Sequence, residues 1–385
     1  MFRLPLKSLM SRPPAAVAAE LLPGELPVHG GPDVLGVPRV DFSTNANPLP
    51  PPAAVLQALA GADRCRYPEP GYHRLREHLA ALTGCQPSQV LPSAGSAEAI
   101  RRLSLLAQLQ GRRQVWLPEP GYADYRAAAQ ALGLLVRGWT TPDELLQGLW
   151  DEPAACLVWI TEPHNPSGGS LPASFWAELG DLLARRDHWL ALDRAYEPLR
   201  LRGACGLPAA LAARAWQLWS PNKALGQCGV RAGWLQAPAG EALLARAAGA
   251  LAPSWVLSAE GVALLQVFHD AAVQDWLDSA RHTLRRWQAD QHARLGALGW
   301  HWQPGSVTPF ALARPPLPAH RLGAVLAGLR AQGLKLRDAT SMGLPGWVRL
   351  SAQSPAAVDE LVRAWPGLAG ESDAAAGPAP QPTTF

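Results

Sequence analysis

Helical and strand patterns alternate along residues 50–240, and this alternation limits the fold more than any other feature of the sequence. Helices are expected at 72–83, 96–109, 122–132 and 173–185, and strands at 88–91, 113–117, 155–161, 188–193 and 214–219. Strands that alternate with helices build a mostly parallel sheet with helices on both faces. The sequence therefore predicts an α/β, three-layer sandwich.

The rest of the chain divides into an arm, a second domain and a tail. Residues 1–45 are rich in Pro and Gly and predict an N-terminal arm before a large domain over 46–245. Residues 246–367 predict a smaller C-terminal α+β domain. Its expected elements are a long helix near 270–298 and short strands near 307–313, 334–337 and 346–351, with a further helix between them. Residues 368–385 have the composition of a disordered tail.

Charge and hydropathy exclude two classes of protein. The 34 Lys and Arg residues against 31 Asp and Glu give a net charge of +3, and the charges are interspersed, whereas a nucleic-acid binder shows a basic face. Charged residues or proline interrupt every apolar stretch before the roughly 18 to 20 residues that span a bilayer. The start of the chain lacks the unbroken apolar segment of a signal peptide. We expect a cytoplasmic protein that binds neither nucleic acid nor membrane.

Cysteine, histidine and lysine usage narrows the chemistry. The five cysteines are scattered without a C-x-x-C pair, and His73 and His78 are five positions apart rather than the four of a helical zinc site. We expect no metal site. Lys7, Lys223 and Lys335 are the three lysines. Their scarcity reflects either a general preference for arginine or a chemistry that needs a primary amine at few positions.

Polar side chains follow the predicted strands, where ligands bind in parallel α/β sheets. Gly95 and Ser96 lie where a helix begins, and the free N–H groups of a helix start suit a phosphate, although such residues are also ordinary caps. Tyr122 follows the next strand and would either stack on a planar ligand or pack at the rim of the core. Asn165 lies in a turn after a third strand.

Three charged residues are further candidates for a ligand site: Asp193, Lys223 and Arg349. Asp193 ends an apolar strand, and a buried carboxylate needs a cationic partner. Lys223 follows another strand, and Arg349 lies inside an apolar strand where it needs an anion. A lysine for a Schiff base, an acid for a ring nitrogen, a stacking aromatic and a phosphate turn are what pyridoxal phosphate requires. We therefore predict this cofactor.

From about residue 29 to 365 the sequence resembles the fold-type I pyridoxal-phosphate enzymes of the class I/II aminotransferase superfamily. The resemblance rests on Ser220-x-x-Lys223 with Arg231, after Asn165-Pro-x-Gly and Asp193-x-x-Tyr196. It implies three catalytic residues: Lys223 bound covalently to the cofactor, Asp193 on its ring nitrogen and Tyr122 stacked on the ring. It also implies that the remaining cofactor ligands are Gly95, Ser96, Ala97, Ser220 and Arg231 for the phosphate, and Asn165 and Tyr196 for the 3-hydroxyl. Tyr67 would reach the neighbouring subunit's cofactor, which implies a homodimer.

Within the superfamily the chain is similar to the histidinol-phosphate aminotransferases and most similar to the L-threonine-O-3-phosphate decarboxylases of cobalamin biosynthesis. The features that favour the second group are His29-Gly30-Gly31, Asp41-x-Ser43-Thr44-x-x-Asn47 and the segment 336–346. By this likeness Arg337 and Arg349 bind the substrate's phosphate and carboxylate, in an order left open. The other substrate residues would be His29, Gly30, Asn47 and Asn165.

The resemblance implies decarboxylation of L-threonine O-3-phosphate to (R)-1-aminopropan-2-yl phosphate. Two alternatives stay open. One is a histidinol-phosphate or related aminotransferase, and the other is a non-catalytic binding subunit, against which the presence of Lys223 and Asp193 argues. The sequence also departs from the family pattern. Asn222 stands before the lysine where Ser or Gly is usual, a change able to weaken or re-route a hydrogen bond to the phosphate. Arg194 stands where Glu is common, and Gly121 where Thr is usual.

Overall fold

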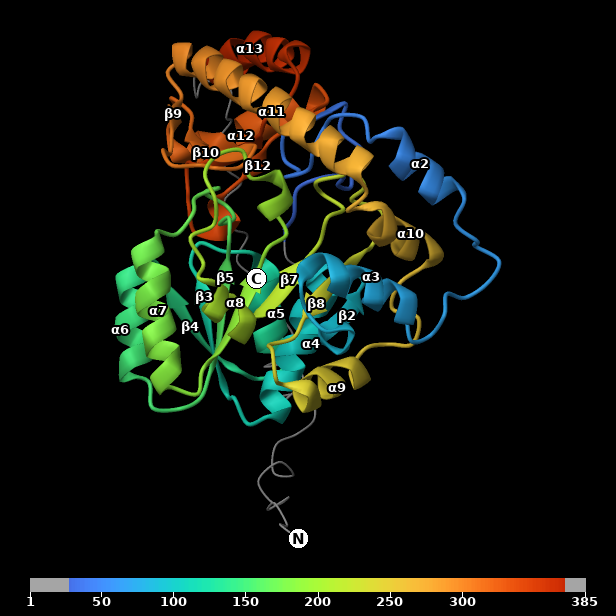
Figure 1. Cartoon of the computed structure of the whole chain (residues 1–385). Helices are drawn as coiled ribbons and strands as arrows, with labels where there is room; N and C mark the ends of the chain where they lie inside the picture. The colour runs from blue at the N-terminus through green and yellow to red at the C-terminus, as the bar shows by residue number, and fades with distance from the viewer. Residues whose placement is uncertain (1–27, 371–385) are drawn as a thin grey trace, which may run out of the picture. The chain divides into compact units, whose positions relative to one another are not determined.

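The computed structural model describes residues 28–370 (Figure 1). The arm expected over residues 1–27 and the tail expected over 371–385 lie outside the described residues. The described chain forms two compact units. Of the described residues, unit 1 contains residue 28 and residues 46–282 and 305–308, and unit 2 contains residues 29–45, 283–304 and 309–370.

Unit 1 is built on a seven-stranded sheet in the order β2-β8-β7-β6-β5-β3-β4. The bounds are β2 (Val90–Ser93), β3 (Gln114–Pro118), β4 (Leu135–Trp139), β5 (Leu157–Thr161), β6 (Trp189–Asp193), β7 (Trp216–Trp219) and β8 (Gly233–Gln236). Only β8 runs antiparallel to its two neighbours, so the prediction of a mostly parallel sheet is confirmed. The strands β4 and β8 were not predicted from the sequence.

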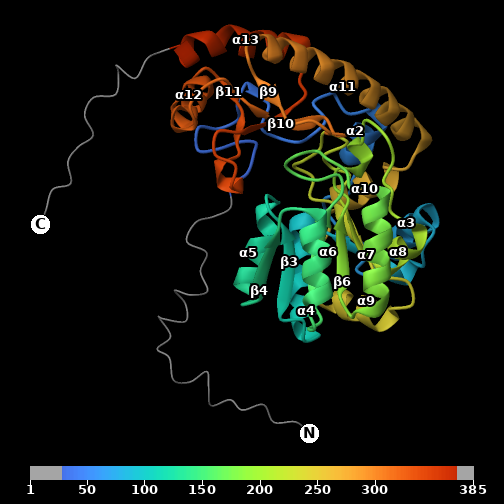
Figure 2. The ribbon, with the colours of Figure 1, turned by 90° about the vertical axis from the view of Figure 1, so that its left-hand side faces the viewer.

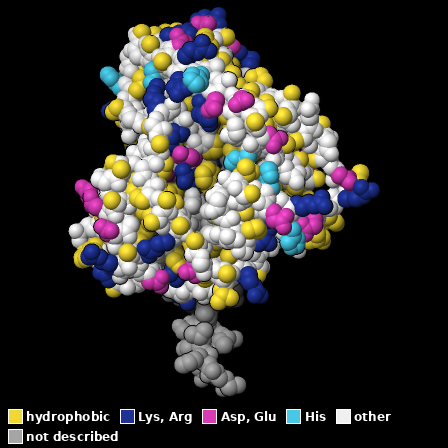
Figure 3. All heavy atoms as spheres, in the orientation of Figure 1, with side chains coloured by type: hydrophobic (Ala, Val, Ile, Leu, Met, Phe, Trp, Pro, Cys, Tyr) yellow, Lys and Arg dark blue, Asp and Glu magenta, His cyan; other side chains and the backbone are white. Residues whose placement is uncertain are grey.

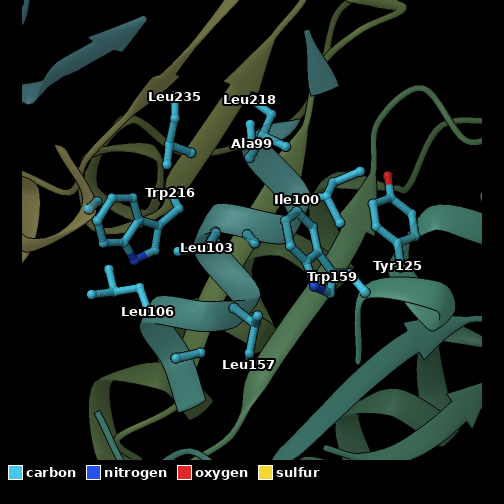
Figure 4. Close-up of a cluster of buried hydrophobic side chains, with 14 of the residues drawn as sticks. Ala99, Ile100, Leu103, Leu106, Tyr125, Leu157, Trp159, Trp216, Leu218 and Leu235 are labelled. Atoms are coloured by element: carbon cyan, nitrogen blue, oxygen red, sulfur yellow. The ribbon is translucent and has the colours of Figure 1, made fainter. Parts of the chain in front are cut away.

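Alternation along the strands gives the sheet two buried faces. In β5, Leu157 and Trp159 join one apolar cluster, while Val158 and Ile160 join another on the opposite face. Figure 4 shows the first cluster, where Trp159 lies beside Ile100 and Tyr125. Helices α4 (Ser96–Leu109), α5 (Ala123–Ala131) and α9 (Ala242–Ala250) contribute to that cluster.

The opposite face carries α6 (Pro142–Asp151), α7 (Ala173–Arg185) and α8 (Ala209–Arg214). In Figure 2, α6 and α7 run side by side in front of the sheet. Helices on both faces make this the three-layer sandwich that the sequence predicts.

Three helices lie beside the sandwich in unit 1. They are α2 (Ala53–Ala60), α3 (His73–Thr83) and α10 (Ala259–Val267), and α10 packs against both of the others. This packing keeps residues 246–282 with unit 1, although the change of sequence pattern near 245 suggests a boundary there. Helix α11 (Ala271–Ala297), expected at 270–298, runs from unit 1 into unit 2.

Unit 2 has the α+β character expected from the sequence. Its antiparallel sheet has the order β12-β13-β10-β9, and a separate parallel pair joins β1 to β11. The bounds are β1 (Val40–Asp41), β9 (His301–Trp302), β10 (Phe310–Arg314), α12 (Ala319–Ala331), β11 (Leu334–Lys335), β12 (Arg337–Asp338), β13 (Val348–Ser351) and α13 (Pro355–Gly370). Phe42, Trp300, Leu350 and Trp365 lie in its core. Helix α13 continues through Gly370, past the start of the tail expected at 368.

Two surface properties bear on function. Among the described residues, no helix is long and apolar enough to cross a membrane. On the face that Figure 3 shows, basic and acidic side chains are interspersed. This distribution agrees with the mixed charge pattern of the sequence.

Candidate active site

The predicted site residues of unit 1 follow the ends of its parallel strands. Gly95 and Ser96 come after β2, Tyr122 after β3, and Asn165 after β5, while Asp193 is the last residue of β6. Ser220 and Lys223 follow β7. Because parallel strands end at the same edge of a sheet, the topology gathers these residues at one edge of unit 1.

Asp193 is a buried carboxylate with neutral partners. It is 3% exposed. Its Oδ2 accepts a hydrogen bond of 2.8 Å from the Tyr125 hydroxyl, and its Oδ1 accepts one of 3.0 Å from the Ala195 N–H. None of the described residues forms an ion pair with it. Burial raises the pKa of Asp193, and the charge of Lys223 opposes part of that rise. The carboxylate is therefore placed to receive a cation from a ligand.

Tyr125 is a candidate site residue that the sequence pattern did not predict. Its ring stacks on Trp159, with the centroids 4.9 Å apart, and in Figure 4 its hydroxyl points away from the apolar cluster. Burial and the nearby Asp193 raise the pKa of Tyr125, so the hydroxyl stays protonated and donates. The Thr161 hydroxyl lies 2.8 Å from it. The only signal in the sequence was the position of Tyr125, three residues after Tyr122.

Lys223 lies in a turn after β7 that several hydrogen bonds hold. Its backbone N–H donates to Asn222 Oδ1 at 2.9 Å, and its carbonyl accepts from the Asn47 N–H at 2.9 Å. The Asn47 side chain donates to the Ala224 carbonyl at 3.1 Å. The Lys223 Nζ lies 5.3 Å from the centroid of the Tyr196 ring. Asn47, expected to bind substrate, thus has its amide on the backbone of the lysine turn.

The start of α4 forms a cradle for an anion. Gly95 has a φ of +89°, and a Cβ there would lie 2.7 Å from Arg231 Nη2, so the backbone meets the guanidinium closely. The hydroxyls of Ser93 and Ser96 are buried and have no hydrogen-bond partner among the described residues. Free N–H groups at Ser96 and Ala97, a guanidinium and an unused hydroxyl suit a phosphate.

His164 joins the two loops that carry Tyr122 and Asn165. Its Nε2 donates to the Pro120 carbonyl at 3.0 Å, because a carbonyl only accepts, and its Nδ1 lies 2.8 Å from the Ser167 hydroxyl. Burial lowers the pKa of His164 to about 4, so it is neutral near pH 7. Asn165 is 3% exposed. Burial, with a contribution from Asp124, raises the pKa of Tyr122.

Tyr67 lies on the surface of the single chain. It is 76% exposed, and its ring stacks on Trp255 with the centroids 4.3 Å apart. Trp255 in turn donates from its indole N–H to the Pro68 carbonyl at 3.2 Å. An exposed aromatic pair of this kind is typical of a protein–protein contact.

Arg337 and Arg349 lie directly opposite each other on β12 and β13 in unit 2. Both are buried, at 4% and 6% exposure. Arg337 donates to Ser341 Oγ at 2.7 Å and Arg349 to the Ser43 carbonyl at 2.9 Å. Side chains opposite each other on antiparallel strands share a face, and like charges there are unfavourable. The pair therefore suits a ligand that carries negative charge.

The segment around His29 packs in the same unit. A Cβ on Gly30 would lie 2.2 Å from the Ser43 carbonyl oxygen, so this close approach requires glycine. Gly31 donates its N–H to Ser43 Oγ at 2.9 Å, and Ser43 donates its own N–H to Asp41 Oδ1 at 2.8 Å. His29 itself is exposed. Two of the three sequence features that favour the decarboxylase group thus contact each other.

The residues of unit 1 fit pyridoxal phosphate. Asp193 lacks a cation that a protonated ring nitrogen would supply, Lys223 offers a primary amine, and the buried Ser96 hydroxyl lacks a partner that a phosphate would provide. Among the described residues, no three His, Cys, Asp or Glu side chains are grouped as a metal site requires.

Comparisons with known proteins agree with this fit. Residues 37–364 match the family model of aminotransferase class I and II. A histidinol-phosphate aminotransferase of Granulibacter bethesdensis is 30% identical over 91% of this chain and 96% of its own length. One of Burkholderia pseudomallei is 27% identical over 89% and 94%.

Solved structures show the same fold. A histidinol-phosphate aminotransferase of Sinorhizobium meliloti in complex with pyridoxal-5'-phosphate superposes with a TM-score of 0.71 at 21% identity, over 86% of this chain and 91% of that one. An aspartate aminotransferase of Thermus thermophilus gives a TM-score of 0.72 at 20% identity, over 85% and 91%. The chain therefore belongs to the class I and II aminotransferases, fold-type I enzymes whose cofactor is pyridoxal phosphate.

Proposed function

We propose that the protein is an aminotransferase whose amino donor is histidinol phosphate or a closely related phosphorylated amine. The observation that carries the proposal is the pair of buried guanidinium groups, Arg337 and Arg349, which would bind the phosphate of the amino donor. The relatives named histidinol-phosphate aminotransferase, which match about nine-tenths of the chain, support the choice of donor.

Each residue of the site has a role in this reaction. Pyridoxal phosphate, when bound, supplies a ring that withdraws electrons from the substrate carbon bearing the amine. Asp193 would hold the proton on the ring nitrogen, and the Tyr125 hydroxyl, which donates to Asp193 Oδ2, keeps that carboxylate in place. Lys223 Nζ removes the proton from the substrate carbon. Tyr122 and Asn165 would orient the ring. The phosphate would be bound by Gly95, Ser96, Ala97 and Arg231.

We further propose that the protein works as a homodimer. The exposed Tyr67 and Trp255 would lie at the contact, where Tyr67 reaches the cofactor of the partner subunit. Sedimentation velocity would give the mass in solution. A monomer that is fully active would contradict the proposed role of Tyr67.

A second candidate is the decarboxylation of L-threonine O-3-phosphate. The observation that favours it is the packing of Gly30 and Gly31 on Ser43, because these segments are the ones that resemble the decarboxylases. This substrate carries a phosphate and a carboxylate, one for each of Arg337 and Arg349. The same residues would then align the bond from the α-carbon to the carboxylate, and Lys223 would return a proton to that carbon.

One pair of assays separates the candidates. The protein with pyridoxal phosphate is given histidinol phosphate and 2-oxoglutarate, and glutamate is measured. In parallel it is given L-threonine O-3-phosphate without a keto acid, and CO2 is measured. We expect glutamate and no CO2. Catalytic release of CO2 would replace the aminotransferase by the decarboxylase.

The Lys223→Ala protein is the control for both assays. It should lack both activities and also the visible absorbance of the lysine–cofactor linkage. If the native protein shows neither that absorbance nor either product, the remaining alternative of a non-catalytic binding subunit is favoured.

A further inference from the structure

The hydroxyl of Ser220, expected to bind the cofactor phosphate, donates its hydrogen bond inside the protein. Ser220 is 2% exposed. Its Oγ lies 2.9 Å from Asn222 Oδ1 and 3.4 Å from the Ala232 carbonyl oxygen, and both atoms accept. A serine hydroxyl has one proton to donate. A phosphate offers only acceptors, so Ser220 cannot donate to Asn222 and to a phosphate at the same time.

The orientation of the Asn222 amide decides the direction of that hydrogen bond. Asn222 Oδ1 also accepts the backbone N–H of Lys223 at 2.9 Å, and Nδ2 donates to the Val230 carbonyl at 3.3 Å. Exchanging the two ends of the amide would place an NH2 group against an N–H and an oxygen against a carbonyl. Both contacts therefore fix Oδ1 toward Ser220, which must be the donor.

These contacts join the two segments that carry the charged groups of the cofactor site. Asn222 holds the backbone of Lys223 on one side. On the other side, Asn222 Nδ2 donates to the carbonyl of Val230, the residue that precedes Arg231. Asn222 is 1% exposed, so its amide is shielded from water that would compete for these bonds.

We propose that Asn222 is a positioning residue: it accepts the Ser220 proton, which withdraws that hydroxyl from the phosphate site, and its amide holds the segments of Lys223 and Arg231 in fixed relation. The phosphate is then bound by the start of α4 and by Arg231. The buried Ser96 hydroxyl, which lacks a partner among the described residues, takes the place of Ser220 as the hydroxyl donor.

The test compares the affinities of the apoprotein for pyridoxal phosphate and for pyridoxal, which lacks the phosphate. Quenching of tryptophan fluorescence gives both dissociation constants. The dissociation constant for pyridoxal divided by that for pyridoxal phosphate, here called the affinity ratio, measures what the phosphate contributes to binding. Ser96→Ala should lower this ratio about tenfold, because it removes a hydrogen bond to a charged group. Ser220→Ala and Asn222→Ala should leave the ratio within about twofold of the native value.

A second measurement detects the positioning role. The pH at which the lysine–cofactor absorbance changes reports the surroundings of Lys223 Nζ. Ser220→Ala and Asn222→Ala should shift that pH in the same direction, and the double variant should shift it no further than the larger single change. Ser104→Ala is the matched control, because Ser104 is a buried serine of α4 whose hydroxyl also lacks a partner among the described residues. It should change neither quantity.

Two outcomes would overturn the proposal. One is a fall in the affinity ratio for Ser220→Ala as large as for Ser96→Ala, which would mean that Ser220 donates to the phosphate. The other is additive shifts of the two single variants, which would mean that Ser220 and Asn222 act independently. If Asn222→Ala does not fold, the affinity ratio of Ser220→Ala alone still decides between the two arrangements.

Discussion

Two buried carboxylates lie at the ends of neighbouring strands in unit 1. One forms an ion pair, and the other accepts hydrogen bonds from neutral groups. Glu162 directly follows β5 and is fully buried, and Arg200 Nη2 lies 2.6 Å from its Oε1. Asp193 ends β6 and is almost as deeply buried, but it accepts hydrogen bonds from neutral groups, Tyr125 and Ala195. The backbone N–H of Glu162 even donates to the Asp193 carbonyl at 3.0 Å.

This difference indicates that Glu162 contributes to stability, whereas Asp193, on the neighbouring strand, serves the function of the site. Removing a charge from water is unfavourable unless a partner compensates for it. For Glu162 the chain supplies that partner, so the ion pair forms part of the folded structure. For Asp193 the chain supplies hydrogen bonds from neutral groups and the more distant charge of Lys223, so the full compensation must come with the cofactor. A buried carboxylate without an ion-pair partner among the described residues therefore indicates a ligand site more clearly than burial alone does.

The largest expected effect is on activity, from Asp193→Asn. The amide cannot hold a proton on the ring nitrogen, so kcat should fall about a thousandfold or more. The unfolding temperature of the apoprotein should stay the same or rise, because a neutral group replaces a buried acid. Steady-state kinetics and thermal unfolding measure the two quantities. Retained activity together with a less stable apoprotein would mean that Asp193 serves stability rather than function.

Arg200→Met should give the opposite result. It leaves Glu162 buried without its cation, and we expect a loss of about 3–5 kcal/mol in the free energy of unfolding. Adding Glu162→Gln should recover most of that loss, because it removes the uncompensated charge. Urea unfolding of the single and double variants measures both effects. Equal stability of the two variants would show that Arg200 does not act through Glu162.

Tyr125→Phe tests how much the neutral hydrogen-bond partners of Asp193 contribute to its function. It removes the hydroxyl that donates to Oδ2, and a hydrogen bond to a charged group contributes about 1.5–3 kcal/mol. We expect kcat to fall about tenfold or more, with little change in the KM for the amino donor. Thr161→Val, which leaves the bond from Tyr125 to Asp193 in place, serves as the control and should have a smaller effect. An unchanged kcat for Tyr125→Phe would mean that Ala195 alone holds the carboxylate.

The smallest effect concerns pH and His164. Burial lowers the pKa of His164 to about 4 from an ordinary value of 6.5, so the unfolded chain binds more protons between these values. Stability should therefore rise with pH across this window, and fall as the pH is lowered from 6.5 toward 4. His164→Gln should reduce that fall by about 1–3 kcal/mol. Unfolding at pH 4.5 and pH 7 measures the difference, and identical pH dependence of both proteins would contradict it.

The sequence predicted the residues that follow strand ends, because a strand end is visible in the local pattern. Asp193, Lys223 and Ser96 were identified in this way. Tyr125 was missed because its ring belongs to the apolar face of α5 and only its hydroxyl reaches Asp193. For Asn47 the resemblance implies a role in substrate binding, which stays a prediction. The contact of its amide with Ala224, 177 positions away, is one that no local pattern can reveal.

The same limit applies to the fold. Helix α11 was predicted almost to its ends because buried positions recur every three or four residues along its 27 residues. The strands β4 and β8 were missed for local reasons. Gly138 and Arg137 interrupt the run of β4, and β8 consists of four residues beginning at Gly233. The pairing of these strands with β3 and β7 is set by the sheet rather than by their own composition.

The pairing of β1 with β11 has a consequence for the order of events during synthesis. Val40 pairs with Leu334, and Ser351 donates its N–H to the Phe42 carbonyl. A ribosome thus completes residues 46–282 of unit 1 long before the partners of residues 29–45 exist. The first described segment of the chain is therefore expected to be among the last to acquire its native contacts, in contrast to the usual order in which N-terminal parts fold first.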